Sequence, residues 1–426
     1  MNRLTRALRH RNYRLFFGGQ TVSLIGTWIT RIATSWLVYR LTKSALLLGI
    51  VGFAGQIPLL ILGPLGGVVG DRWDRHKILV WTQVLSALQS LALAILAFTH
   101  ITVVQIIVLQ VIQGIINAFD TPARQAFVVE MVDDREDLPN AIALNSAMFN
   151  GSRIIGPSIG GIMIAVVGEG WCFMADAISY VAVIISLLAM RFVRVPRKPP
   201  ETHVIEELRA GFQYVARFAP VRALLLIASL VSIFGTPYIV LMPAIASSVL
   251  HGGPHTLGLL MTASGVGALM GTFYLASRHT VVGLGKVIIT ATVGLSLGLI
   301  AFAFTRSLLV AILVIPIVGA GMMLQSASAN TILQTIVEEH MRGRVMAFYS
   351  MAVLGAMPIG SLISGILADR IGAQNTIIAG AVVCIAGAVY FGFRRPALAA
   401  LIRPIYVDRG ILAEAVPETS PLSSQA

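Results

Sequence analysis

The chain has 426 residues, of which 56% are hydrophobic and only 12% charged, and its mean hydropathy is +0.84. A soluble protein of this length would carry roughly 25% charged residues, so the composition excludes a disordered or nucleic-acid-binding protein and disfavours an ordinary cytosolic enzyme. Twelve spans of about 21 residues would use roughly 250 positions, which leaves enough for loops, one linker and two tails. The sequence therefore predicts a polytopic membrane protein.

The formal net charge of +12 comes from residues that flank apolar runs and do not form one continuous basic stripe. They are read as topology signals, not as a nucleic-acid site. Cys172 and Cys384 are the two cysteines, and both lie in apolar stretches, which indicates neither a disulfide framework nor a CxxC metal or redox pair. We expect no metal and no cofactor.

Apolar runs between charged or turn-rich breaks predict twelve membrane helices, several of them long enough to tilt or to extend into the cytoplasm. In the first half they are expected at 15–40, 45–70, 77–98, 101–123, 140–168 and 170–192. In the second half they are expected at 221–250, 255–278, 283–305, 307–333, 343–370 and 374–393.

These spans predict an all-α integral membrane protein with two six-helix bundles. The expected parts are a basic N-terminus over 1–14, bundles over 15–192 and 221–394, a linker over 193–220, and a tail over 395–426. With a cytoplasmic N-terminus, the outer side keeps only four basic residues, namely Arg40, Lys43, Arg306 and Arg370. Since cytoplasmic loops carry the excess of Lys and Arg, both termini are predicted to be inside.

The linker opens with a proline-rich stretch over 194–200, where a helix cannot continue. It then carries Val204, Ile205, Leu208, Phe212 and Val215 at helical spacing with charged residues between them, which predicts an amphipathic helix on the inner membrane surface. The segment over 404–426 is expected to be disordered.

The two halves repeat each other weakly. Residues 22–27 (VSLIGT) match 231–236 (VSIFGT), and the same shift of 209 pairs Gly49 with Gly258. A shift of 204 pairs further small residues of predicted helices 5 and 11, among them Gly151 with Gly355, Gly156 with Gly360 and Gly161 with Gly365. Ordinary small-residue packing is the alternative, but two matches in the same order favour duplication. Parallel repeats suggest alternating access, with the substrate held between the halves.

A charged loop joins predicted helices 2 and 3 in the order Gly67, three residues, Asp71, Arg72, two residues, Arg75. A small residue lets helix 2 approach a neighbour closely, Asp71 can accept hydrogen bonds from a helix N-terminus, and the arginines can pair with nearby carboxylates. A charged turn that merely obeys the positive-inside rule is the alternative.

Helix 4 is predicted to end in Asp120 and Arg124, four residues apart and so on one helical face, unless Pro122 disturbs the register. We interpret the pair as partners of Arg75 in one charge network; a solvated helix end is the alternative.

Helix 5 carries Gly156, Pro157, Gly160 and Gly161. Residues 156–160 formally match the G-x-S-x-G nucleophile elbow, but that motif needs a strand-turn-helix context that a membrane span does not provide. A proline within a helix can kink it and glycines allow close helix packing, while a purely structural proline kink is the alternative.

Charges expected well inside the membrane, away from the helix ends, are few, namely Arg31, Arg153 and Asp176. Such charges are costly and should be paired or face a cavity. Asp176 is a candidate proton carrier, or else an ion-pair or structural residue. The second half offers only neutral polar candidates, Tyr238, Gln325 and Asn330. A cavity with cationic groups on one wall and neutral groups on the other suits a bulky amphipathic solute that is neutral or anionic.

The loop over 67–77 resembles the signature of the major facilitator superfamily, except that Asp74 stands where that signature has glycine. Residues 156–161 resemble the helix 5 motif of its exporters. Further stretches over 9–395 resemble the enterobactin-exporter-like permeases, and they are 11–17 (RNYRLFF), 23–26 (SLIG), 41–44 (LTKS), 122–125 (PARQ), 138–141 (LPNA) and 207–212 (ELRAGF).

This resemblance implies that the Asp71 loop latches the cytoplasmic side closed against helix 11. It also implies that helix 1 lines the cavity, which makes Arg31 the preferred substrate or coupling residue, and that helix 6 is peripheral. Finally, it implies a bacterial inner-membrane protein driven by protons.

The resulting hypothesis is a monomeric transporter, not an enzyme, that exports a small amphipathic molecule in exchange for protons. Its expected partners are that solute, protons and the lipid bilayer. The sequence contains neither a Walker A motif nor an H-E-x-x-H zinc motif. An uptake permease and a non-transporting sensor or assembly factor on the same fold remain alternatives.

Overall fold

The computed structural model describes residues 3–132, 134–191, 204–278 and 280–412, and its regular elements are all helices. Eleven helical segments of the described chain are long and apolar enough to cross a membrane. The predicted span over 15–40 corresponds to a further helix of 32 residues, α1 (Arg11–Thr42), which is more polar than the eleven.

In the first half, α1 is preceded by a short 3₁₀ helix, η1 (Arg3–Arg9), and followed by five long helices. They are α2 (Ala45–Arg72), α3 (Arg75–Phe98), α4 (Val103–Glu130), α5 (Leu138–Val167) and α6 (Glu169–Leu188), with a 3₁₀ turn, η2 (Arg135–Asp137), before α5. Local sequence sets several starts. Ser44 caps α2, and Thr102 with Gln105 forms a capping box on α4.

The predicted linker helix is present as α7 (Val204–Arg217), while the proline-rich stretch before it lies outside the described residues. The second half contains α10 (Pro254–Ala276), α11 (Leu284–Phe304), α12 (Leu308–Ile336) and α15 (Ala373–Asp408). Two of its predicted helices are not continuous α-helix. The first is divided into α8 (Ala219–Leu230), η3 (Val231–Gly235), α9 (Tyr238–Ala244) and η4 (Ile245–Val249), and the second into α13 (Glu339–Ser350), η5 (Met351–Gly355) and α14 (Ala356–Ile371).

These three η segments are π-helical. Pro237 has no N–H to donate to the carbonyl of Ile233, and the Thr236 N–H bonds five residues back to Val231 at 2.9 Å. The wide turn brings the Ile233 backbone against Gly360 of α14, where a side chain would not fit. Proline chemistry and a glycine contact together explain why this predicted helix is interrupted.

Two predicted helix ends are wrong. Helix 4 continues through Pro122 to Glu130, and α15 continues through Pro396 and Pro404 to Asp408. The disorder expected from residue 404 is therefore wrong for 404–408, and residues 413–426 lie outside the described chain. Packing of Leu398 and Tyr406, both buried, against the second half compensates for the carbonyls that the prolines leave unpaired.

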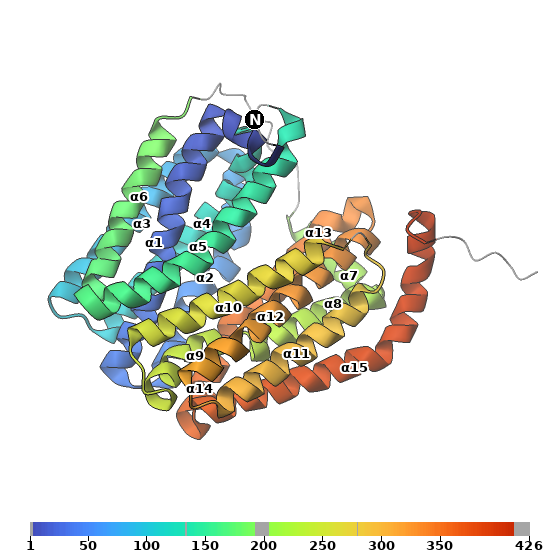
Figure 1. Cartoon of the computed structure of the whole chain (residues 1–426). Coiled ribbons are helices and arrows are strands. Elements are labelled where there is room, and N and C mark those ends of the chain that lie inside the picture. Colours follow the sequence, from blue (N-terminus) through green and yellow to red (C-terminus); the bar gives the residue numbers. More distant parts are fainter. Residues whose placement is uncertain (1–2, 133, 192–203, 279, 413–426) are drawn as a thin grey trace, which may run out of the picture.

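Helices α1 to α6 pack mainly among themselves, as do α8 to α15, and Figure 1 shows the two groups side by side. They meet chiefly where α5 crosses α10 and where α2 crosses α14. Two glycine pairs make these crossings close: side chains added at Gly161 and Gly365 would lie about 3 Å from the Cα atoms of Gly258 and Gly49. The repeat shift of 209 relates Gly49 to Gly258, and the shift of 204 relates Gly161 to Gly365. The Gly49–Gly365 and Gly161–Gly258 contacts are therefore counterparts in the internal repeat.

The apolar core is divided unequally along the molecule. At one end a single cluster joins both halves and includes Leu48 and Phe173 from the first half with Leu257 and Phe302 from the second. At the other end each half has its own cluster, one around Phe127 and one around Tyr349. The two groups of helices therefore share a core at the end that holds the α2–α14 and α5–α10 glycine contacts, and have separate cores at the end that holds the Asp71 loop.

Candidate functional site

The loop between α2 and α3 forms an ion-pair cluster around Arg75. Its guanidinium lies 2.8 Å from Asp71 Oδ1 and 2.9 Å from Glu130 Oε1, and Nε donates to the Gly70 carbonyl at 2.9 Å. Asp71 is half exposed and Arg75 is 15% exposed. All these partners belong to the first half, so in this conformation the cluster is built within one group of helices.

Glu130 was missed by the sequence analysis because helix 4 was predicted to end before it. The last two turns of α4, which continue past Pro122, carry it to Arg75. Arg72, by contrast, is exposed.

The close approach expected at Gly67 is wrong in this structure, since a side chain there would meet nothing within 4 Å. The neighbouring Gly66 is the residue that has no room, because an added Cβ would overlap the Ala118 carbonyl of α4. Gly66 thus sets the α2–α4 contact.

Asp74, which departs from the superfamily signature, is the N-cap of α3. Its carboxylate accepts hydrogen bonds from the backbone N–H groups of His76 at 3.0 Å and Lys77 at 3.4 Å. A capping carboxylate stabilises a helix start through these bonds and through the helix dipole. The substitution of glycine by Asp74 is therefore compatible with the turn.

Asp120 forms a second cluster with other partners. It is buried, accepts hydrogen bonds from Thr82 at 2.9 Å and Gln83 at 2.8 Å, and pairs with Arg124 at 3.0 Å. The predicted Asp120–Arg124 pairing is thus present, but the predicted single network with Arg75 is wrong in this structure, because Arg75 pairs with Asp71 and Glu130 instead. The partners on α3 were not predicted, because nothing in the sequence spacing relates α3 to α4.

The glycine and proline residues of α5 contact two different helices. Gly156 packs against Ile25 and Trp28 of α1, Gly160 packs against Ile29, and Gly161 packs against α10. Thr262 of α10 donates to the Ile154 carbonyl at 3.0 Å and lies 3.2 Å from Ser158 Oγ. Ser158 sits inside a helix, so the nucleophile-elbow reading has no structural basis here.

Three predicted site residues converge where the halves meet near mid-span. The Arg31 guanidinium lies 4.9 Å from the centroid of the Trp28 ring, and its charge interacts with that of Arg153. Arg153 in turn interacts electrostatically with Tyr238, whose hydroxyl lies 2.7 Å from Ser264 Oγ. The Arg31 side chain is exposed although it lies within a membrane-spanning helix.

The other predicted site residues lie apart from this group. Asp176 is buried among α1, α3 and α6, accepts a hydrogen bond from Ser90 at 2.7 Å, and leaves no room for a side chain at Gly26. Gln325 is buried on α12 and its Nε2 has no partner among the described residues, while Asn330 accepts from Gln334 at 2.6 Å. The structure does not bring these residues to Arg31.

An unpredicted network fixes the N-terminus to the loop before α5. Asp137, which is fully buried, lies 3.0 Å from Arg6, 2.8 Å from Arg9 and 3.0 Å from His10. Burial raises the pKa of Asp137, but the His10 hydrogen bond and the positive charges outweigh it, so the pKa lies below its ordinary value. The density of Arg and His over 3–11 was the only sequence signal, and it names no partner.

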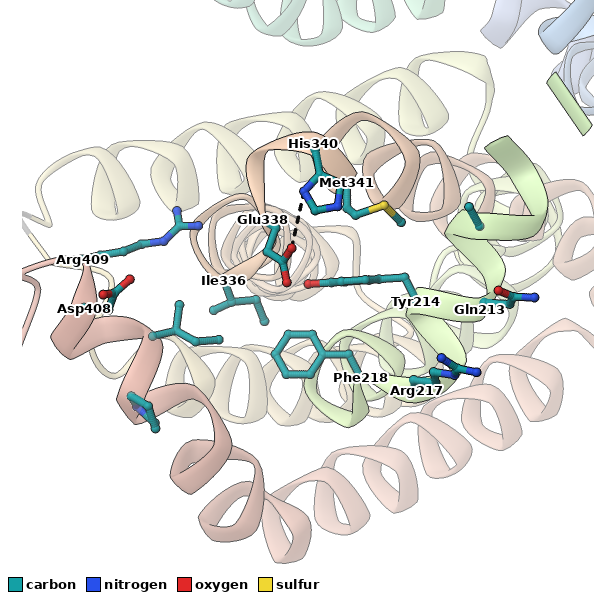
Figure 2. Close-up of a pocket in the computed structure, with 13 residues that line it drawn as sticks. Gln213, Tyr214, Arg217, Phe218, Ile336, Glu338, His340, Met341, Asp408 and Arg409 are labelled. Carbon is teal, nitrogen blue, oxygen red and sulfur yellow. Dashed lines mark ion pairs between the residues drawn. The ribbon is translucent and has the colours of Figure 1, made fainter. Parts of the chain in front are cut away.

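A pocket of about 820 Å³ opens beside the linker helix (Figure 2). Tyr214 and Phe218 on the α7 side face Glu338, which pairs with His340 at 3.4 Å, and Asp408 with Arg409 closes the far side. Because α7 also packs Gly211 and Phe212 against Phe348 of α13, the linker helix is attached to the second half. Within the described ranges, no group of three or more side chains is arranged to hold a metal ion.

The long apolar helices, the few charges enclosed between two packed groups, and the charged loop at one end define a polytopic membrane transporter. Residues 5–404 match the model of the transmembrane secretion effectors, so the chain belongs to this family of the major facilitator superfamily. It is accordingly a multi-pass transporter of small molecules and not an enzyme.

Several bacterial relatives are similar over nearly their whole length. The chain is 27% identical to a staphyloferrin A transporter of Staphylococcus aureus, over 89% of this chain and 95% of the relative. It is 26% identical to a macrolide efflux protein of Streptococcus pyogenes (89% and 96%) and 25% identical to an enterobactin exporter of Salmonella typhi (90% and 91%).

Solved structures share the fold at low identity. A bacterial homologue of the human lysosomal transporter Spinster, solved inward-facing and unoccupied, has a TM-score of 0.73 at 14% identity and covers 94% of this chain and 98% of its own. A POT family transporter in complex with 5-aminolevulinic acid has a TM-score of 0.74 at 11% identity, with 91% and 96% covered. At such identities the likeness establishes the fold alone.

Proposed function

We propose that the chain is a proton-coupled exporter of a small amphipathic molecule, of the siderophore or drug-like kind, that works by alternating access. The observation that carries this proposal is the unequal core: the halves share one apolar cluster at one end and have separate clusters at the other. A shared core can act as a hinge while the separate ends approach and part.

In this proposal α1 is the twelfth membrane helix, and residues 15–192 and 221–394 are two six-helix bundles joined by the linker over 193–220. The matched glycine contacts Gly49–Gly365 and Gly161–Gly258 support two equivalent halves, since the repeat shifts exchange them. With both termini in the cytoplasm, the Asp71 loop lies on the cytoplasmic side. The end at which the two halves have separate cores then faces the cytoplasm.

The Arg75 cluster acts in this scheme as the cytoplasmic latch. Its pairs with Asp71 and Glu130 hold the loop in shape while the inner ends are apart. When those ends close, we infer that the half-exposed Asp71 meets the start of α13, where a helix N-terminus favours a carboxylate. Asp120 and Arg124 support the loop from α4.

Arg31, Arg153 and Tyr238 form the proposed substrate site. Two cationic groups beside a neutral hydroxyl favour an anionic or neutral amphipathic solute. Asp176 could carry the proton only if water reaches it between α1 and α3. Its hydrogen bonds with Ser90 and Ser179 favour a structural role instead.

The relatives named for efflux of macrolides and export of enterobactin support export over uptake. The test uses purified protein in liposomes of known orientation, with an imposed pH gradient and a panel of siderophores and macrolides. We expect at least one solute to move in the direction opposite to the proton flux, and a protonophore to abolish this movement. Movement only in the direction of the proton flux would favour the uptake permease, and no movement of any solute would favour the sensor.

A further inference from the structure

The C-terminal part of α15 covers an apolar cavity of about 230 Å³ that lies apart from the site above. The cavity lies between the start of α8, the α10–α11 turn, the end of α12 and the extension of α15 beyond residue 390. Its walls include Leu224, Ile332, Phe391 and Leu398, all less than a tenth exposed. This apolar part of the lining offers water no hydrogen-bonding partners.

Two guanidinium groups stand at the edge of this cavity. Arg395 and Arg403 both line it, and Arg395 Nε lies 3.7 Å from the position that a Cβ would take at Gly285. Neither forms an ion pair with any residue in the described part of the chain. Arg278 nearby donates to the Val282 carbonyl at 2.9 Å and adds a third positive charge.

The depth of Arg395 matches the surface of a bilayer, and Arg403 lies about two turns further along α15. Arg395 lies about 22 residues after the start of α15, which is roughly 33 Å along an α-helix, while the hydrocarbon core is about 30 Å thick. Phe391 is therefore placed at the end of the hydrocarbon and Arg395 at the level of the headgroups. In Figure 1 α15 bends toward its C-terminal end, and Leu398 and Tyr406 of this extension still pack against the second half.

We propose that this cavity binds an anionic phospholipid of the adjacent leaflet, with part of an acyl chain between α8, α12 and α15 and the phosphate on Arg395 and Arg403. The acyl chain is the apolar solute available at this depth. The planar guanidinium groups suit a phosphate by paired N–H donors. Bound lipid would hold the extension of α15 against the second half.

The test measures lipid binding by native mass spectrometry of the full-length protein, titrated with dioleoyl phosphatidylglycerol or dioleoyl phosphatidylcholine. We expect the anionic lipid to bind several-fold more tightly. Arg395→Gln and Arg403→Gln should each weaken it about fivefold, the usual effect of one basic residue near an anionic membrane. Arg394→Gln, which removes an exposed charge beside the cavity but not in it, should leave binding unchanged.

A second variant separates the acyl chain from the phosphate. Ala399→Trp fills the cavity from an exposed position and keeps both arginines, so it should weaken both lipids. Circular dichroism verifies that each variant is folded. The proposal is overturned if Arg394→Gln costs as much as Arg395→Gln, or if inorganic phosphate competes while Ala399→Trp has no effect, which would indicate a free-anion site. The C-terminal segment, which lies outside the described residues, carries two carboxylates, Glu414 and Glu418, that could compete for the arginines. The proposal is also overturned if lipid binds only to the double variant Glu414→Gln/Glu418→Gln, because the chain's own tail would then be the occupant.

Discussion

At the scale of single residues, Arg31 combines features that a buried structural arginine would not. It is exposed, lies 4.9 Å from the centroid of the Trp28 ring and interacts electrostatically with a second cation, Arg153. Two like charges without a carboxylate among their described contacts favour the anionic or neutral solute that we propose as substrate. Both arginines and their depth in the membrane were predicted from the sequence, whereas the interaction between Arg31 and Arg153 was not.

Arg31→Ala should therefore weaken anionic substrates more than neutral ones. Losing a hydrogen bond to a charged group costs about 1.5–3 kcal/mol, which corresponds to roughly 10- to 100-fold in apparent affinity. The measurement is the KM of one anionic and one neutral substrate in vesicles, with Arg31→Lys as the charge-conserving control. An equal loss for both substrates would reject direct charge recognition.

Asp71→Asn should impair transport while the protein still folds and inserts. Asp71 is half exposed in its ion pair with Arg75, so loss of the pair costs at most about 1 kcal/mol of stability. The proposed latch, by contrast, would lose the carboxylate that it requires in the closed state. Initial transport rates are compared at equal amounts of inserted protein. Asp369→Asn removes an exposed carboxylate of α14 and serves as the control. Full activity of Asp71→Asn would remove the latch assignment.

Asp137→Asn should lower the midpoint of thermal unfolding at neutral pH. Because the pKa of Asp137 is depressed below its ordinary value of 3.8, the stabilisation is fully present above that value and is lost as the pH falls through the folded pKa. The deficit of the variant should thus shrink in acid, measured in detergent at pH 7 and at about pH 3. Asp134→Asn, which removes an exposed partner of Arg9, should show a smaller deficit. A deficit independent of pH would contradict the ionic explanation.

At the scale of elements, apolar runs located nearly every membrane segment because hydrophobicity is a local property of the chain. The interruptions within helices and the helix ends were harder to predict from the sequence. The prolines in α4 and α15 do not end those helices, since packing against distant residues compensates for the missing backbone bonds. The π-helical turns of η3 and η5 depend on neighbours from α14 and α2, with Leu60 of α2 packed against Gly355.

The α5–α10 crossing should tolerate no side chain at its glycine contact. A Cβ at Gly161 would lie 2.8 Å from the Pro254 carbonyl and 3.0 Å from Gly258 Cα, so Gly161→Val should destabilise the shared end by about 1–3 kcal/mol. We expect slower transport and a lower unfolding midpoint. Gly151→Val places the same side chain on the same helix where nothing lies within 4 Å. If both variants behave alike, the effect comes from helix propensity and not from the crossing.

At the scale of the whole molecule, the separate cores predict an accessible surface at the end that holds the Asp71 loop, which we propose is cytoplasmic. Ser146 is exposed and lies two turns before Arg153 on the same face of α5. Ser146→Cys should react with a membrane-impermeant maleimide from the cytoplasmic side, and conditions that close this end should slow the reaction. Background labelling should be low because Cys172 and Cys384 are buried. Reaction from the outer side alone would contradict the proposed orientation.

Composition and the spacing of apolar runs by themselves determined that this is a membrane protein of many helices with an internal repeat, because a bilayer constrains each span separately. The tertiary structure alone decided that Glu130 joins Arg75, that Asp120 bonds to α3, and that Gly66 makes the close contact instead of Gly67. It also decided that the two halves share a core at only one end. These features depend on atoms that folding brings together from distant parts of the chain, and no local pattern encodes such distances.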